Sequence, residues 1–261
     1  ASQPTRTHKQ DYEYQIKMFL SILKSSLREE VEHTVHSSAA DIEYLLKNAT
    51  DSNLVNMQLH AFANETASES PAPGGGSVAA YVGSLGLSLA TMVANLSSHK
   101  KGWDSRWEEF SNWAAKGQQL KDELIRLVDA DTLAFNKIMD AFALPKATNE
   151  EKTFRNKSIQ EATKFAIEIP FKVMEVSFAG MELIKAMAEK GNPNSVSDAG
   201  VGALCARSAV MGAFMNVRIN AAGYDDKNYV AEIVKKGTDI QNKAIAMEAE
   251  IVKRVNDKIG L

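Results

Sequence analysis

The sequence predicts an all-α fold, a bundle of long antiparallel helices, and three observations lead to this prediction. Apolar residues recur at spacings of three and four along most of the chain, and no run of alternating β-branched residues occurs. Residues 104–142 contain no proline and only one glycine, so one helix can run through all of them. Hydrophobic residues make up 44% of the 261 positions, which is enough for a sizeable core.

The helix expected to follow Ser77 is the centre of this bundle. It belongs to a stretch, residues 71–98, that has no charged side chain in a chain that is 24% charged. Its residues form a bulky apolar stripe and a small one, which predicts a helix buried on both faces. The bulky stripe is Val78, Val82, Leu85, Leu89, Met92 and Leu96, and the small stripe is Ala79, Gly83, Gly86, Ala90 and Ala94.

Three glycines, Gly74, Gly75 and Gly76, precede this helix, and Ser77 is its expected N-cap. We interpret the glycines as a turn that other residues would not tolerate freely. Backbone N–H groups at such a helix start suit a carboxylate, a carbonyl or another electron-rich ligand group, so these four residues are candidate substrate-binding residues. The spacing excludes a phosphate-binding P-loop, because no Lys-Ser/Thr pair follows the glycines and no strand precedes them.

Composition argues against several classes of protein. The many Gly, Ser and Ala residues of 71–98, with Asn95 in the last turn and no flanking positive bias, argue against a membrane span. A net charge of −3 argues against nucleic-acid binding. The single cysteine, Cys205, predicts a small core residue and a reducing compartment. Because the N-terminus has no apolar signal segment, we expect a cytoplasmic protein, and the scattered histidines predict no metal site.

The remaining helices follow from caps and breakers, after a boundary that we place behind residue 53. Leu144-Pro145 stops the long helix, and Pro170 divides the next helical stretch into two. The helix capped by Ser197 has a seam of small apolar residues, which predicts a second closely packed helix. This seam consists of Ala199, Ala203, Ala206, Val210, Ala213 and Val217. The expected helices after the boundary are 54–67, 77–98, 104–142, 149–168, 170–190 with Gly191 as C-cap, 198–222 and 226–258.

Asp131 is the candidate catalytic residue. The helix 104–142 has an apolar stripe, and Asp131 occupies a vacant position within it, three residues after Val128 and four before Phe135. Burial would raise the pKa of this carboxyl toward the range useful for proton transfer. The alternative is a structural carboxylate that a buried arginine or a helix cap satisfies. Asp129, by contrast, is expected to point to solvent.

Three polar residues of the helix 198–222 are candidate substrate-binding residues. Asn216 and Asn220 lie one turn apart within an apolar helix, so each amide needs a buried partner or a ligand. Asp198 lies in the first turn, where its charge also favours the helix dipole. The structural alternatives are an amide network that stabilises the bundle and a capping role for Asp198.

Three segments together resemble one protein family: SPAPGGGSVAA around Gly74, LVDADTLAF around Asp131, and GNPNSVSDAGVGALCARSAVMGAFMNVRIN, which ends at Asn220. In this order they resemble the cyclodeaminase family, which comprises the folate-processing module of formimidoyltransferase-cyclodeaminase and its single-domain cyclohydrolase relatives. The resemblance runs from about Leu54 to near the C-terminus. It matches Asp131 to the family's proposed catalytic aspartate. An amide pair such as Asn216 and Asn220 can read the donor/acceptor edge of a pterin.

The resemblance also implies a domain organisation. Residues 54–261 correspond to a cyclodeaminase-like helical bundle domain. Residues 1–53 correspond to a remnant of an inter-module linker, and an N-terminal helical appendage is the alternative.

The resemblance implies a formimidoyltetrahydrofolate cyclodeaminase, an ammonia-lyase that converts 5-formiminotetrahydrofolate to 5,10-methenyltetrahydrofolate and ammonia in histidine degradation. A methenyltetrahydrofolate cyclohydrolase is one alternative, and a non-catalytic helical module that binds folate or dimerises is another. No cofactor is expected beyond the tetrahydrofolate substrate. The expected partners are folate, including its polyglutamate form, and a formimidoyltransferase module. We also expect a homodimer or larger oligomer, because the chain has more apolar helix faces than one bundle of this length needs.

Overall fold

The computed structural model describes residues 54–260, which form an all-α domain and confirm the predicted fold class. The chain divides into two units, residues 1–53 and 54–261, and the described residues belong to the second. The predictions for residues 1–53 lie outside the described residues. Residues 54–260 contain six α-helices, three 3-10 helices and no β-strand. These elements are η1 (Leu54–Asn56), α3 (Leu59–Thr66), α4 (Gly75–Ser98), η2 (Asp104–Arg106), α5 (Trp107–Ala143), α6 (Asn149–Lys190), η3 (Pro193–Ser195), α7 (Val196–Ala221) and α8 (Lys227–Ile259).

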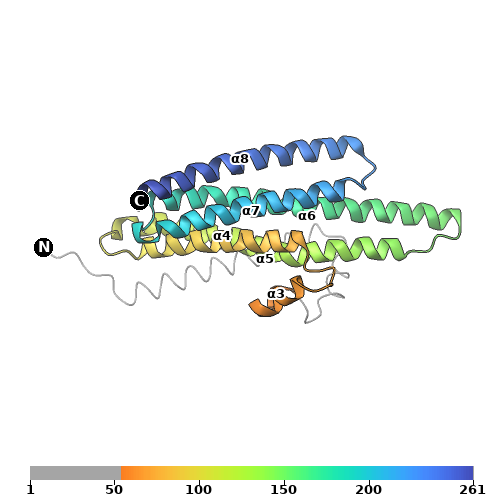
Figure 1. Cartoon of the computed structure of the whole chain (residues 1–261), viewed down its shortest axis with the longest axis horizontal. Coiled ribbons are helices and arrows are strands. Elements are labelled where there is room, and N and C mark those ends of the chain that lie inside the picture. Colours follow the sequence, from red (N-terminus) through yellow and green to blue (C-terminus); the bar gives the residue numbers. More distant parts are fainter. Residues whose placement is uncertain (1–53, 261) are drawn as a thin grey trace. The chain divides into compact units, whose positions relative to one another are not determined.

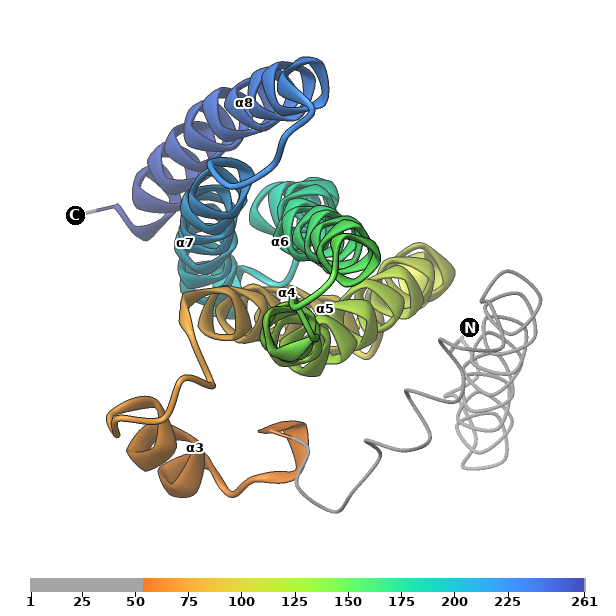
Figure 2. The same ribbon diagram turned by 90° about the vertical axis from the view of Figure 1, so that its right-hand side faces the viewer.

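Four helices, α4 to α7, surround one core, and α8 packs on the outside of α6 and α7 (Figure 1). Consecutive long helices run antiparallel, as the sequence predicts. Figure 2 shows the same helices end-on, with α4 between α5 and α7. Each helix of the four therefore has an interior face and an outer face.

The small-residue stripes of α4 and α7 meet in the interior, which confirms the predicted close packing. Every residue of the α7 seam is 0% exposed. A Cβ atom added to Gly86 of α4 would lie only 2.8 Å from the carbonyl oxygen of Gly202 in α7. The two backbones therefore approach too closely for a larger residue at this crossing.

The bulky stripe of α4 does not lie in the core, so the prediction of a helix buried on both faces is wrong. The interior side of α4 consists of the small stripe together with Leu87 and Val93, which are both 0% exposed, and the bulky stripe faces outward. The outer side of α7 carries large apolar residues in the same way. We call the most exposed of them the outer apolar face: Leu85 (43% exposed), Met92 (38%), Leu96 (45%), Val201 (48%), Leu204 (45%), Met215 (57%) and Ile219 (72%).

By length and composition alone, two described helical segments could cross a membrane, Gly75–Ser98 and Pro193–Ala221. In their most apolar windows, 61% and 50% of the residues are buried inside the bundle. That burial is what a core helix of a bundle shows, because its interior face is as apolar as a membrane span.

α6 is one continuous helix, whereas the sequence predicts two helices divided at Pro170. A proline inside a helix lacks the N–H that would bond the carbonyl four residues earlier, which here belongs to Ala166. Asn220 of α7 supplies the missing donor, because its Nδ2 lies 2.7 Å from the carbonyl oxygen of Ala166. The helix continues through Pro170 with this carbonyl satisfied from the neighbouring helix.

We expect Asn220→Ala to lower the free energy of unfolding by about 1–3 kcal/mol, because the buried Ala166 carbonyl would lose its donor. Pro170→Ala restores a backbone N–H at the right place, so in that background the same substitution should cost less than about 1 kcal/mol. Urea unfolding of the four proteins in this cycle measures the difference. Equal costs in both backgrounds would contradict the link between Pro170 and Asn220.

α5 and α6 extend beyond the start of α4 (Figure 1). Asp131 accepts a hydrogen bond from Ser77 in the first turn of α4, so it lies at this end of the four-helix core. α5 has 37 residues and α4 has 24, a difference of about 20 Å at 1.5 Å per residue. The predicted apolar stripe of α5 is buried at Leu124 and Val128, but Met139 and Phe142 are 51% and 50% exposed. The stripe is therefore a core stripe only as far as the turn that contains Asp131.

Candidate active site

Asp131 of α5 and Ser77 of α4 form the centre of the candidate site. The backbone N–H of Ser77 donates to Oδ2 of Asp131 at 2.8 Å, and the Ser77 hydroxyl lies 3.0 Å from the same oxygen. This hydroxyl also lies 3.0 Å from the carbonyl oxygen of Val128 and 3.4 Å from the hydroxyl of Thr132. The carboxylate therefore sits at the first turn of α4, where N–H groups are unpaired and the helix dipole favours negative charge.

The three glycines begin α4 instead of forming a separate turn, which corrects the prediction. Gly74 is the N-cap, with φ −96° and ψ −170°, an extended conformation that any residue adopts, and Ser77 is the third residue of the helix. Space is what requires glycine here. A Cβ atom on Gly76 would collide with Oδ1 of Asp131, and one on Gly75 would lie 3.3 Å from Nδ2 of Asn216.

The start of α4 keeps donors available for a ligand. The N–H groups of Gly75 and Gly76 precede the first intrahelical bond, which runs from Val78 N–H to the Gly74 carbonyl. Within residues 54–260, no acceptor is hydrogen-bonded to either of these two N–H groups. They can therefore bind an electron-rich group placed beside Asp131.

Asn216 of α7 lies against Gly75, and so joins the same end of the bundle. Its Nδ2 donates to the Gly212 carbonyl at 3.0 Å, one turn earlier in α7. Its side-chain oxygen accepts no hydrogen bond from the described residues. Asn216 therefore offers an acceptor to a ligand near the two free N–H groups.

Burial raises the pKa of the Asp131 carboxyl above its ordinary value. The hydroxyl and N–H of Ser77 act in the opposite direction, because they stabilise the carboxylate, but burial is the larger effect. The contact with Ser77 also gives Asp131 a structural role, because its carboxylate accepts hydrogen bonds at the start of a helix, as the structural alternative expected. Asp131 thus stabilises the start of α4 and remains a group that can take up and return a proton.

Two of the predicted site residues do not reach Asp131 within one chain. Asn220 donates to the Ala166 carbonyl, so its amide is engaged between α6 and α7. Asp198 lies in the first turn of α7, 18 residues before Asn216, which is about 27 Å along the helix.

Asp129 does not point to solvent, which corrects another prediction. Its carboxylate accepts hydrogen bonds from the backbone N–H groups of Leu54 and Val55 in η1. Burial is again the larger effect and raises the pKa of Asp129. The sequence pattern of α5 contains no signal for this contact, because the partners come from a distant segment of the chain.

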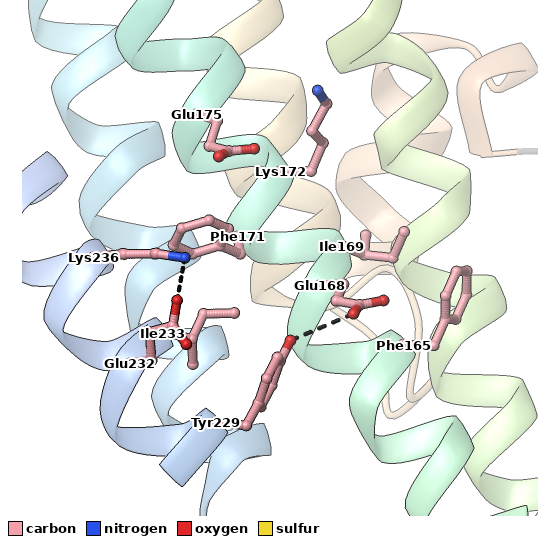
Figure 3. Close-up of a pocket in the computed structure, with 10 residues that line it drawn as sticks. All are labelled: Phe165, Glu168, Ile169, Phe171, Lys172, Glu175, Tyr229, Glu232, Ile233 and Lys236. Carbon is pink, nitrogen blue, oxygen red and sulfur yellow. Dashed lines mark hydrogen bonds and ion pairs between the residues drawn. The ribbon is translucent and has the colours of Figure 1, made fainter.

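A cavity of about 450 Å³ lies between α6 and α8 and contains none of the predicted site residues (Figure 3). The hydroxyl of Tyr229 donates to Oε1 of Glu168 at 3.4 Å. Burial and the neighbouring Glu168 raise the pKa of Tyr229 to about 12. The other lining residues are Phe165, Ile169, Phe171, Lys172, Glu175, Glu232, Ile233 and Lys236. Another cavity, of about 560 Å³, lies between α4 and α5 and includes His99 and Lys121.

Among residues 54–260, no group of three or more His, Cys, Asp or Glu side chains lies close enough together to hold a metal ion. The expectation of no metal site remains a prediction. Cys205 is half-buried in α7 and is a free thiol, and burial raises its pKa.

Comparison with known proteins identifies relatives. The family described as formiminotransferase-cyclodeaminase matches residues 58–239. Methenyltetrahydrofolate cyclohydrolase of Methylorubrum extorquens is 36% identical over 205 residues, which cover 78% of this chain and 99% of that protein. Formimidoyltransferase-cyclodeaminase of Gallus gallus is 36% identical over 204 residues, which cover 78% of this chain but only 38% of that protein.

A solved structure is also similar. The formiminotetrahydrofolate cyclodeaminase of Thermotoga maritima superposes with a TM-score of 0.64 at 27% identity. The match covers 78% of this chain and 96% of that one. The helical fold is therefore shared along nearly the whole length of that relative.

Proposed function

Because the chain belongs to the formiminotransferase-cyclodeaminase family, we propose that it is a formimidoyltetrahydrofolate cyclodeaminase, an ammonia-lyase of histidine degradation. The relatives support a folate-processing cyclodeaminase or cyclohydrolase activity. The observation that supports catalysis, in either of these two reactions, is the Asp131 carboxyl, which has a raised pKa and lies against the first turn of α4. A non-catalytic helical module would gain from this carboxyl only the contact with Ser77 at the start of α4.

In the proposed reaction, N10 of 5-formiminotetrahydrofolate attacks the carbon of the protonated, cationic formimino group, the ring closes, and ammonia leaves, so that the methenyl product carries the positive charge. The Asp131 carboxylate takes the N10 proton and returns it to the departing nitrogen, so one group acts first as base and then as acid. A raised pKa favours this double role, because the carboxyl holds the proton between the two steps. Oδ1, the oxygen that faces Gly76, has no hydrogen bond to Ser77, whose two contacts are both with Oδ2.

We propose that the start of α4 binds the folate together with Asn216, and we call Gly75, Gly76 and Asn216 the grip. The free N–H groups of Gly75 and Gly76 suit a carbonyl or carboxylate, and the side-chain oxygen of Asn216 suits an amino group of the pterin edge. Asn220 and Asp198 are outside this grip within one chain. Asn220 remains next to it through α7, where it stabilises the contact with α6.

A methenyltetrahydrofolate cyclohydrolase is the second candidate, and one observation favours it. The chain spans 99% of the Methylorubrum extorquens protein of that name but 38% of the Gallus gallus protein. In that reaction water opens the methenyl ring to give 10-formyltetrahydrofolate, and Asp131 would take the proton from water. Both reactions use the same site, so substitutions in the grip do not distinguish them.

A product assay distinguishes the two reactions. Given 5-formiminotetrahydrofolate, a cyclodeaminase raises the methenyl absorbance and releases one ammonia per turnover. Given methenyltetrahydrofolate, it hydrolyses this compound slowly by comparison. Rapid hydrolysis of methenyltetrahydrofolate with no ammonia from the formimino compound would make the protein a cyclohydrolase. Inactivity of the folded protein on both compounds would favour the non-catalytic module.

The outer apolar face supports a further proposal, that a second copy of this chain binds there. α4 has no charged side chain, and two neighbouring helices of about 36 Å present roughly 700 Å², close to the about 800 Å² per partner of a stable interface. A bilayer is a poorer occupant. The ion pair of Lys116 and Glu182 is exposed on the same bundle at the level of Thr91, and a bilayer core excludes such a pair.

We expect a dimer of about twice 28.5 kDa by light scattering at micromolar concentration. Leu204→Glu should convert it to a monomer, because it places a charge in the middle of the outer apolar face. Ile259→Glu is the matched control on α8, where the side chain is 44% exposed, and should leave the dimer intact. A wild-type protein that remains monomeric would contradict a second copy on this face.

The other expectations concern partners and location. We propose that the protein acts in the cytoplasm, on folates that include polyglutamates, with no cofactor beyond tetrahydrofolate. A formimidoyltransferase supplies the formimino substrate, and that activity is joined to a cyclodeaminase in the name of the Gallus gallus relative.

A further inference from the structure

Residues 54–73, which we call the arm, begin and end beside the same turn of α5. At the beginning, Asp129 accepts hydrogen bonds from the N–H groups of Leu54 and Val55. After the arm the chain enters α4, where the N–H of Ser77 donates to Asp131 at 2.8 Å. Two carboxylates, two residues apart on one helix, therefore hold the two ends of this loop.

The attachment at Asp129 has both a polar and an apolar part. Leu54 is 8% exposed and belongs to the core, and η1 packs against α5. A carboxylate that accepts two backbone N–H groups forms stronger hydrogen bonds than a neutral acceptor does. Farther along the arm the attachment is weaker, since Leu59 in α3 is 70% exposed.

The middle of the arm contacts α4 beside the candidate site. The ring of Phe62 in α3 lies 5.3 Å from the ring of Tyr81, centroid to centroid. Tyr81 follows Ser77 by one helical turn, and both rings are partly buried against the core. The arm therefore borders the end of the bundle at which Ser77 meets Asp131.

We propose that Asp129 is a positioning residue that holds the arm against α5, so that the arm forms one wall of the folate site. This inference rests on the proposed function of the Asp131 site. Asp129 points about 200° around the helix from Asp131, at 100° per residue, and the arm occupies its carboxylate. Asp129 therefore affects the affinity for the folate, while Asp131 transfers the proton in the chemical step.

We call the hydrogen bonds from Leu54 and Val55 to Asp129 the anchor. Two substitutions weaken it, one at the acceptor and one at a donor. Asp129→Asn keeps the shape but weakens the acceptor, and Val55→Pro removes one of its two donors while Asp129 stays. We expect each to raise KM for the folate substrate about 10-fold with kcat within about 2-fold of wild type, because uniform binding is lost and the chemical step is not. Val55→Ala keeps the N–H, and Asp122→Asn removes an exposed carboxylate that pairs with Lys121. Both controls should match the wild type.

Amide hydrogen exchange of residues 54–62 reads the anchor without reference to activity. Exchange should be faster in Asp129→Asn and Val55→Pro than in the wild type and the two controls. Unchanged KM despite faster exchange would overturn the role of the arm as a wall. A fall in kcat as large as that of Asp131→Asn would instead place Asp129 in the chemistry, and so would also overturn the proposal. If the wild type is inactive on both folates, the proposed function is overturned, and with it the role of Asp129 in substrate binding. The exchange rates of residues 54–62 still show in that case whether Asp129 holds the arm.

Discussion

Asp131→Asn should lower kcat by about 100-fold or more, because general acid–base catalysis contributes on that scale and an amide does not titrate. The substitution keeps the shape of the side chain, and its amide oxygen can still accept from the Ser77 N–H. Folding and folate binding should therefore survive. Steady-state kinetics with 5-formiminotetrahydrofolate and methenyltetrahydrofolate, together with a binding measurement on a reduced folate, check both parts.

The control for this prediction is Asp122→Asn, which removes a carboxylate of the same helix that is 42% exposed and pairs with Lys121. It should leave kcat unchanged. The wild-type pH profile is a second readout. Since the base must be deprotonated and burial raises its pKa, kcat/KM should fall with decreasing pH at a midpoint above the ordinary aspartate value of about 3.9. Full activity of Asp131→Asn would remove Asp131 from the mechanism.

Gly76→Ala should lower kcat/KM by about 100-fold, because a shift of about 1 Å in a catalytic group costs this much. The added Cβ would collide with Oδ1 of Asp131, so either the carboxylate or the start of α4 must move. The same crowding should lower the free energy of unfolding by about 1–3 kcal/mol, the usual cost of an overpacked site. Enzyme kinetics and urea unfolding measure the two effects.

Gly74→Ala is the matched control, two residues away in the chain. Its added Cβ would lie 3.8 Å from the Pro71 carbonyl oxygen, an ordinary contact, and its φ of −96° suits alanine. It should change kcat/KM by less than about 3-fold, because it moves neither Asp131 nor α4. If both alanines were equally harmful, the need for glycine would lie in the backbone conformation of a glycine turn and not in the space beside Asp131.

Local periodicity was sufficient for most of the fold. A helix repeats every 3.6 residues, so the α7 seam from Ala199 to Val217 is visible in the sequence, and all six of its residues are fully buried. The boundaries of α5 and α8 are within three residues of those expected. The vacancy in the α5 stripe also indicated Asp131 correctly as a partly buried carboxyl. Its catalytic role, like the binding roles of the glycines and Asn216, remains a prediction.

Periodicity was insufficient where a helix has two apolar faces. α4 shows a small and a bulky stripe, and the sequence does not tell which of them the rest of the chain covers. The structure buries the small stripe, because Gly86 and its neighbours allow α7 to approach closely. Leu85, Met92 and Leu96 are left outside. This choice belongs to the packing of helices and not to α4 alone.

The sequence by itself determined most of the helices, the α7 seam and the partly buried position of Asp131, because each depends on residues a few positions apart in one helix. Only the tertiary structure decided which polar groups of different helices and segments contact one another. It joined Asp131 to Ser77, Asp129 to Leu54, and the Ala166 carbonyl, which Pro170 leaves free, to Asn220. These partners are between 54 and 75 positions apart, so no local spacing reports them. They follow from the free energy of the packed bundle, in which a buried polar group without a partner is costly.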